Sequence, residues 1–253
     1  ANLYSDYARL LLDTGDILGS IKNYEKVLKD YDSQKIEENS PWRYTTYTHL
    51  ANAFVLNKEM IKANNYAFQA LIGKYSIYSE DNYAIANELL GMAHVYQYEK
   101  KLWDVSEVLY RKALSIFKRD TMSDNYCRCL AGLSIVTKNI DLAVKAYGII
   151  QSVEKKYDAY TYIEVINALV SEEPEKALQM GEKMLTLYIS QEDPSVIQYV
   201  YALMGKASYL LNDNNMAETY LKNIDISQSK GATYFQQAAE EIEANIPLLR
   251  NIL

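Results

Sequence analysis

The sequence of 253 residues has few of the residues that interrupt regular structure, with 9 glycines and 4 prolines. All-β sandwiches and barrels need more turns than so few breakers supply, which argues against an all-β fold. Cysteine is also rare, since Cys127 and Cys129 are the only two and lie one residue apart. They cannot build a disulfide framework, so we expect a reduced, cytoplasmic setting.

Long apolar runs and clusters of positive charge are missing too. No stretch approaches the roughly 20 apolar residues of a membrane helix, and no segment resembles a signal peptide, so we expect no membrane contact. The net charge is −7, and no run of Lys or Arg exceeds two residues. This acidity argues against nucleic-acid binding, and DNA would be bound only through a domain outside this chain. Because the sequence opens at Ala1 inside an amphipathic pattern, we expect it to be a piece of a longer protein.

Motifs of catalysis are missing as well. His49 and His94 are the only histidines, without an H-E-x-x-H motif, a nucleophile elbow or a glycine-rich phosphate loop. Side chains two residues apart on a helix point about 200° apart, so Cys127 and Cys129 cannot share a metal ion. Buried thiols are the simpler interpretation. We expect a chain that is not an enzyme and takes no cofactor or metal.

Internal repetition is the strongest positive signal. A helix with a small residue, a polar turn, and a second helix opening on another small residue recur six times, and the second small residue follows the first by 12 or 13 positions. The first-helix positions are Ala8, Ala51, Ala93, Ala131, Val165 and Gly205, and the second-helix positions are Ser20, Ala63, Ser106, Ala143, Ala177 and Ala217. The pattern predicts helical hairpins that approach closely at these residues. The 24 tyrosines suggest many half-buried positions with a hydrated hydroxyl group.

Polar turns and helix starts divide the chain at matching places, among them a turn at Thr14-Gly15-Asp16 and a helix start at Pro174. We expect units over about 1–31, 42–76, 83–119, 123–156, 158–190 and 195–227, and a closing helix over 232–253 that Pro247 kinks. No linker separates the units, so one repeat domain spans 1–253. The fold class is all-α: a right-handed superhelical solenoid of about six degenerate helix–turn–helix repeats with a C-terminal closing helix.

These residues carry a family resemblance. The segments Tyr7–Leu28, His49–Leu71 and Met92–Leu114 resemble tetratricopeptide repeats (TPRs) most clearly, and the fifth unit, with Val165 and Gly181, least. More narrowly, long repeats rich in Tyr, Asn, Lys and Ile resemble the peptide-sensing domains of Gram-positive quorum-sensing regulators, the Rap/NprR/PlcR/Rgg group. This resemblance implies a cytoplasmic sensor of a short, re-imported signalling peptide that regulates transcription.

Two alternatives stay open beside the sensor. The chain could be a general TPR scaffold that binds a segment of a larger protein, or an enzyme such as a phosphatase of the Rap type. No helical bundle that would carry the phosphatase is evident, and no DNA-binding headpiece lies within residues 1–253. The intact regulator would carry its effector domain before Ala1.

The candidate site is the face of the first helices, which lines the concave groove in TPR arrays. An extended peptide needs partners for its backbone groups, which Asn amides supply, a cation for a carboxylate, and aromatic side chains for its own side chains. The peptide-binding candidates are Arg9, Thr48, Asn52, Asn87, His94, Gln97, Tyr98, Asn125, Arg128, Tyr162, Lys206 and Tyr209. The plain alternative is that each is an ordinary exposed polar residue of a helical array.

The end of the chain predicts self-association. Ile242, Ile246, Leu248, Leu249, Ile252 and Leu253 leave apolar side chains on a repeat whose outer face should be polar. We therefore expect a homodimer through the last unit and this tail.

Overall fold

A computed structural model describes residues 2–13, 15–34, 39–57, 59–97, 100–154, 156–190 and 194–224. Within these ranges the regular structure is entirely helical, with twelve α-helices and one short 3-10 helix, η1 (Lys100–Leu102), and no strand. The all-α fold class is thereby confirmed. The expected closing helix over 232–253, the tail contact of the homodimer and Tyr98 lie outside the described residues.

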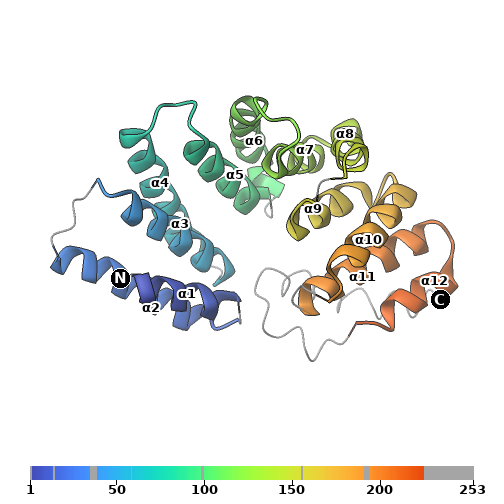
Figure 1. Ribbon diagram of the computed structural model, residues 1–253, viewed down its shortest axis with the longest axis horizontal. Coiled ribbons are helices and arrows are strands. Elements are labelled where there is room, and N and C mark those ends of the chain that lie inside the picture. Colours follow the sequence, from blue (N-terminus) through green and yellow to red (C-terminus); the bar gives the residue numbers. More distant parts are fainter. Residues whose placement is uncertain are drawn as a thin grey trace. The chain divides into compact units, whose positions relative to one another are not determined.

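The α-helices follow one another in six pairs, each formed by a first and a second helix (Figure 1). The pairs are α1 (Asn2–Asp13) with α2 (Ile17–Ser33), α3 (Pro41–Leu56) with α4 (Met60–Ile77), α5 (Tyr83–Gln97) with α6 (Trp103–Phe117), α7 (Asp124–Thr137) with α8 (Ile140–Ser152), α9 (Ala159–Leu169) with α10 (Pro174–Tyr188), and α11 (Pro194–Leu210) with α12 (Asn214–Leu221).

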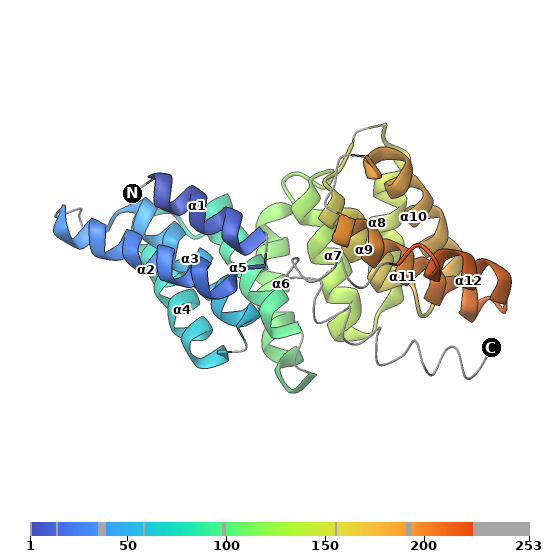
Figure 2. The ribbon, with the colours of Figure 1, turned by 90° about the horizontal axis from the view of Figure 1, so that it is seen from below.

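The described chain forms two compact units. Unit 1 extends through Ile116 and contains helices α1 to α5 and nearly all of α6. Unit 2 begins at Phe117 and contains α7 to α12 (Figure 2). Whether the six pairs act as a single domain stays a prediction.

Close packing at the small residues explains why the helices pair. All twelve small positions of the repeat pattern are buried, as the sequence predicts. In the third pair, for example, the Ser106 hydroxyl of α6 donates a hydrogen bond to the backbone oxygen of Ala93 in α5, 2.7 Å away. A larger side chain at such a position would separate the two helices.

Local signals fix several turns and helix starts. Gly15 has a φ of 87° between α1 and α2, a conformation that glycine adopts without strain. Pro174 occupies the first turn of α10, as expected. Asp16, Ser123 and Asp158 each accept a backbone hydrogen bond as the N-cap of α2, α7 and α9.

Half-buried tyrosines occur as expected, for example Tyr47, but other tyrosines are buried completely. Tyr24, Tyr110, Tyr157 and Tyr162 have no exposed surface and rank among the largest fully buried side chains. Small residues on the neighbouring helices leave room that only a large ring can fill. Tyrosine therefore supplies the large buried rings that phenylalanine supplies in many cores, and the sequence contains only 4 phenylalanines.

Candidate functional site

The first helices of unit 1 lie next to one another. Ala8 of α1 belongs to a buried cluster with Leu50 and Ala53 of α3, and Ala51 of α3 packs with Met92 of α5 in a second cluster. The three first helices α1, α3 and α5 therefore form one continuous layer, on which side chains from successive repeats are neighbours.

A buried ion pair ties this layer together. Glu88 of α5 accepts hydrogen bonds from the Thr48 hydroxyl of α3 and from the Lys74 ammonium group of α4, both at 2.6 Å. The side chain of Glu88 is 3% exposed and that of Lys74 13%. Lys74 also lies 3.3 Å from the Thr48 hydroxyl. A buried charge is stable only when its counter-ion and its hydrogen-bond partners are all present, so the network fixes α3 against α5.

Two exposed amides lie beside this network. Asn52 is one helical turn from Thr48 on α3, and Asn87 immediately precedes Glu88 on α5; both side chains are exposed. Gly91 follows one turn after Asn87, and a Cβ atom there would meet nothing within 4 Å. Of the predicted site, Asn52 and Asn87 thus lie exposed on two helices that the Thr48–Glu88 hydrogen bond joins, with open space at Gly91.

Positive charge borders these amides on the side of α1. The His49 ring stacks on Tyr24 with centroids 5.3 Å apart. Burial lowers the pKa of His49, and the positive charges of Lys74 and Arg9 lower it further. Lys74 is neutralised by Glu88, whereas Arg9 is exposed on α1. The predicted residue Arg9 is therefore the cation that can meet a carboxylate in this part of the surface.

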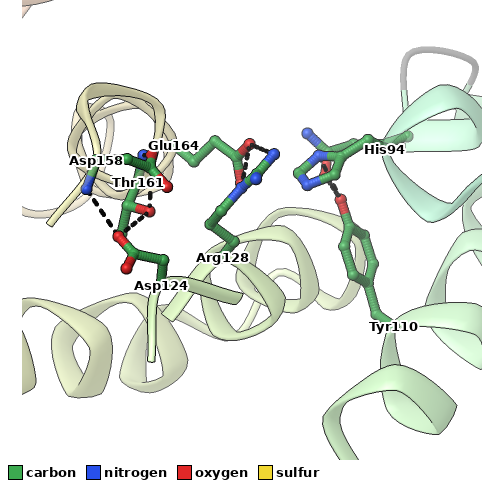
Figure 3. A network of polar contacts seen from close by, with 8 residues as sticks. His94, Tyr110, Asp124, Arg128, Asp158, Thr161 and Glu164 are labelled. Atoms are coloured by element: carbon green, nitrogen blue, oxygen red, sulfur yellow. Dashed lines mark hydrogen bonds and ion pairs between the residues drawn. The ribbon is translucent and has the colours of Figure 1, made fainter. Parts of the chain in front are cut away.

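His94 and Gln97 serve the interior of the third pair instead. Figure 3 shows the His94 ring directed at the hydroxyl of the fully buried Tyr110, with 3.0 Å between Nδ1 and the oxygen. The same hydroxyl donates to Gln97 Oε1 over 2.7 Å. Because a hydroxyl has one proton, His94 Nδ1 donates in this arrangement. His94 is only 8% exposed, so its ring supports α5 against α6.

In unit 2 the predicted cation Arg128 is already engaged. Its Nε and Nη2 atoms lie 3.1 and 3.0 Å from Glu164 Oε1 on α9 (Figure 3). Burial raises the pKa of Glu164, and the Arg128 charge opposes that shift. As a peptide-binding candidate, Arg128 is expected to offer its charge to a carboxylate. The structure instead shows a contact between α7 and α9.

A second set of polar contacts joins the same two helices. Asp124 Oδ1 of α7 accepts the backbone N–H of Asp158 at 2.8 Å and the Thr161 hydroxyl at 3.0 Å. Asp158 Oδ1 in turn caps α9 by accepting the Thr161 N–H at 2.8 Å (Figure 3). These bonds hold the N-terminus of α9 to the N-terminus of α7.

The remaining predicted residues of unit 2 are dispersed. Tyr162 is fully buried, in edge contact with the rings of Tyr157 and Tyr188, because α9 is surrounded by α7, α8, α10 and α11. Asn125 is half-buried on α7, while Lys206 is exposed and Tyr209 half-buried on α11. The expectation that Asn52, Asn87 and Asn125 hold one peptide spans both units and stays a prediction.

Glu88, Lys74 and His49 are the residues that sequence reasoning missed. Glu88 bonds to Thr48, 40 residues earlier, and to Lys74, 14 residues earlier. No local pattern links such positions. A buried acid inside an apolar stretch, Ala86-Asn87-Glu88-Leu89-Leu90, was the available signal, because an unpaired buried carboxylate is costly.

The described residues show no other site type. In these ranges, no group of three or more His, Cys, Asp and Glu side chains is placed to hold a metal ion. Both thiols are buried, and burial raises the pKa of Cys129. None of the helices in the described part of the chain combines the length and the apolar character needed to cross a bilayer.

Comparisons with known proteins agree with the fold. No family model matches the sequence, and no curated protein matches it. Among solved structures, BtubC (BKLC) from P. vanneervenii is similar with a TM-score of 0.53 and 16% identity, covering 93% of this chain and 91% of that one. PilF from Pseudomonas aeruginosa is similar with a TM-score of 0.50 and 17% identity, covering 94% and 96%.

A third similar structure has a lower TM-score. It is a putative kinesin light chain from Podosopora anserina with nearly identical TPR-like repeats, at a TM-score of 0.46 and 12% identity, covering 97% of this chain and 95% of that one. At these identities the likeness concerns the fold alone. The first two structures and the six buried small-residue pairs agree on an array of helical hairpins.

Proposed function

We propose that the chain is a non-catalytic protein-interaction module that binds an extended peptide across the first helices of unit 1. The observation that supports this most is the placement of Asn52 and Asn87 beside the buried Thr48–Glu88–Lys74 network. The network makes α3 and α5 a rigid support, so the amides are held before a ligand arrives. Preorganised groups lose less conformational entropy on binding.

The chemistry of this surface fits a peptide backbone. Each Asn side chain can donate and accept hydrogen bonds at once, which matches a peptide group losing water. Arg9 lies on the neighbouring helix and offers a positive charge to a C-terminal carboxylate or an acidic side chain. The open space over Gly91 leaves room for the chain to pass.

Substitution of the amides tests this proposal. Peptides selected against the chain from a random displayed library would be titrated by calorimetry against the parent, Asn52→Ala and Asn87→Ala. Each change should weaken binding by about 1–3 kcal/mol, the cost of a buried peptide group left unpaired. Asn214→Ala, at an exposed position of α12, is the matched control. Unchanged affinity in both groove variants would contradict the proposal.

A short signalling peptide sensed by a cytoplasmic quorum-sensing regulator is the ligand we favour. The sequence resemblance to the Rap/NprR/PlcR/Rgg group supports this narrower proposal. Native mass spectrometry after incubation with culture supernatant of the source organism would detect such a peptide directly. If supernatant adds no mass while selected peptides still bind, the general scaffold for a segment of a larger protein is the better account.

A further inference from the structure

A second groove of unit 1 lies between the second helices α2 and α4, on top of α3, with a volume of about 470 Å³. α2 contributes Glu25 and Asp32, α4 contributes Lys62, Asn65, Tyr66 and Gln69, and α3 contributes Arg43, Tyr47 and Phe54. Arg43 and Asn52 are nine residues apart on α3, which is two and a half helical turns. This groove therefore lies on the side of α3 opposite to Asn52.

Stacked rings make the floor of the groove rigid. Phe54 and Tyr66 are parallel within 2°, with centroids 5.5 Å apart, and Tyr47 packs against Tyr66 at 5.8 Å. The Lys62 ammonium group lies 5.1 Å from the centre of the Phe54 ring. Rings held by each other in this way keep their positions when a ligand enters, and they supply apolar area for its side chains.

The charges around the groove leave one carboxylate in surplus. Arg43 lies 2.8 Å from Asp32, and Lys62 lies 2.5 Å from Glu59, so both cations are neutralised. Glu25 is exposed on the α2 wall and forms no ion pair of its own with the described residues. It shares Lys62 with Glu59, since the hydrogen bond and charge of Glu59 and the charge of Glu25 all raise the pKa of Lys62. Burial raises the pKa of Tyr66 on α4, and the negative charge of Glu25 on α2 raises it further. The charge of Glu25 therefore acts across the groove. A ligand with a positive charge would complete this set.

The α4 side of the groove offers amides and then apolar side chains. Asn65 and Gln69 are exposed and one helical turn apart, as required to contact successive backbone groups of an extended chain. Beside them, Ile61, Phe68 and Ile72 form an exposed stripe along α4, with 80%, 52% and 67% of their surface accessible. Three large apolar side chains aligned on one helix are more than scattered surface residues and mark a contact surface.

We propose that the α2–α4 groove is a second docking surface, which binds an extended segment of another protein with a basic side chain at Glu25 and apolar side chains over Phe68. The carboxylate would select the charge, the amides would bind the backbone, and the α4 stripe would bury the apolar part. This site is independent of the first-helix surface, since the two lie on opposite sides of α3. The module would thus hold two segments at once.

Peptide selection with counter-selection tests this proposal. A displayed library of random 12-residue peptides would be selected on the parent chain and depleted on the double variant Asn65→Ala/Gln69→Ala. The surviving peptides should be enriched in Lys or Arg followed by apolar residues. Fluorescence anisotropy would then compare the best peptide with its Lys→Gln or Arg→Gln version on the parent and on Glu25→Gln.

The expected result is a coupling between Glu25 and the basic residue. Either change alone should weaken binding about fivefold, the size of a partly exposed ion pair, and both together should weaken it no further. Asn52→Ala is the matched control and should leave this binding unchanged. Far-UV circular dichroism melts would show that the variants are folded.

Several outcomes would overturn the proposal. These are a library without enrichment, enriched peptides without basic residues, additive effects of the two changes, or equal loss of binding in Asn52→Ala. Sedimentation equilibrium tests whether a second copy of this chain occupies the groove. Self-association that Glu25→Arg abolishes would mean that a second copy of this chain, and not a foreign segment, fills the groove.

Discussion

Among the described residues, each unit buries one glutamate between neighbouring first helices, and the two units neutralise it differently. In unit 1, Glu88 of α5 receives a lysine from the second helix α4 and a hydroxyl from α3. In unit 2, Glu164 of α9 receives the guanidinium group of Arg128 from the first helix α7. The lysine pair is deeper, with side chains 13% and 3% exposed against 26% and 10% for the arginine pair.

The two networks use the same place in the repeat for different tasks. Thr48 and Arg128 both lie three residues before the small residue of a first helix, Ala51 and Ala131. The threonine is one of two donors to a glutamate, whereas the arginine itself donates two hydrogen bonds to the glutamate. In unit 1 the amide side chains of Asn52 and Asn87 are exposed, while in unit 2 α9 is enclosed by other helices. A place in the repeat thus defines a helix face but not the chemistry there.

The largest expected effect comes from breaking the deeper pair. Lys74→Met should lower the free energy of unfolding by about 3–5 kcal/mol, because Glu88 would keep a buried charge without its counter-ion. Arg128→Met should cost less, about 2 kcal/mol, since water can reach the more exposed arginine pair. Urea unfolding followed by circular dichroism measures both values.

A double variant provides the control for this comparison. Lys74→Met with Glu88→Leu removes both charges and should recover most of the loss, because well-packed apolar residues replace a buried pair at little cost. An Arg128→Met variant less stable than Lys74→Met would reverse the ranking of the two networks.

The next effect concerns helix packing, which should be alike in both units. Ala63→Leu and Ala113→Leu in unit 1, and Ala143→Leu in unit 2, place a larger side chain at positions with at most 1% exposure. Each should cost about 1–3 kcal/mol through overpacking. Ser115→Leu, at an exposed position of α6, is the control for adding a leucine to a helix surface. Thermal melts of all three core variants that match the parent would show that the small positions are not the sites of close helix contact.

The repeat pattern explains how much of the fold could be predicted. Small residues at fixed separations, Gly15 in a turn and Pro174 at a helix start are local features, and the structure confirms each of them. They determine where helices begin, end and approach one another. Such signals depend on neighbours in sequence, so one sequence is enough to read them.

The candidate site was harder to predict from the sequence, because the residues that contact one another there lie far apart along the chain. Arg128 and Glu164 are 36 residues apart, and His94 meets Tyr110 across a helix pair. Repeat position correctly places Asn52 and Asn87 on exposed helix faces. It does not show that Tyr162 is enclosed, since that depends on α7, α8, α10 and α11 packing around α9. The α2–α4 groove likewise arises from rings of different helices.

A smaller effect should follow from the loss of one buried hydroxyl. Tyr110→Phe in unit 1 removes the group that contacts His94 and Gln97, and should cost about 1–2 kcal/mol because their polar atoms lose a partner. Tyr126→Phe in unit 2 removes a hydroxyl that only accepts from the exposed Lys145, and should cost less than about 1 kcal/mol. Equal unfolding free energies for the two variants would show that the His94 contact adds nothing to the stability of unit 1.

The smallest expected effect is a pH dependence in unit 2. Burial raises the pKa of Glu164 above its ordinary value of 4.5, and Arg128 offsets only part of this shift. At pH values between the ordinary pKa and the raised pKa of the folded chain, Glu164 binds a proton more readily in the folded chain than in the unfolded chain. The contribution of Glu164 to the free energy of unfolding therefore increases as the pH falls through this range. Glu164→Gln removes this titration. The unfolding free energy of the parent minus that of Glu164→Gln, measured by urea titration, should therefore increase as the pH is lowered from neutral toward the ordinary pKa. In Arg128→Met, the unfolding free energy should depend on pH more steeply than in the parent. A difference that decreases toward acid pH would show that the arginine outweighs burial.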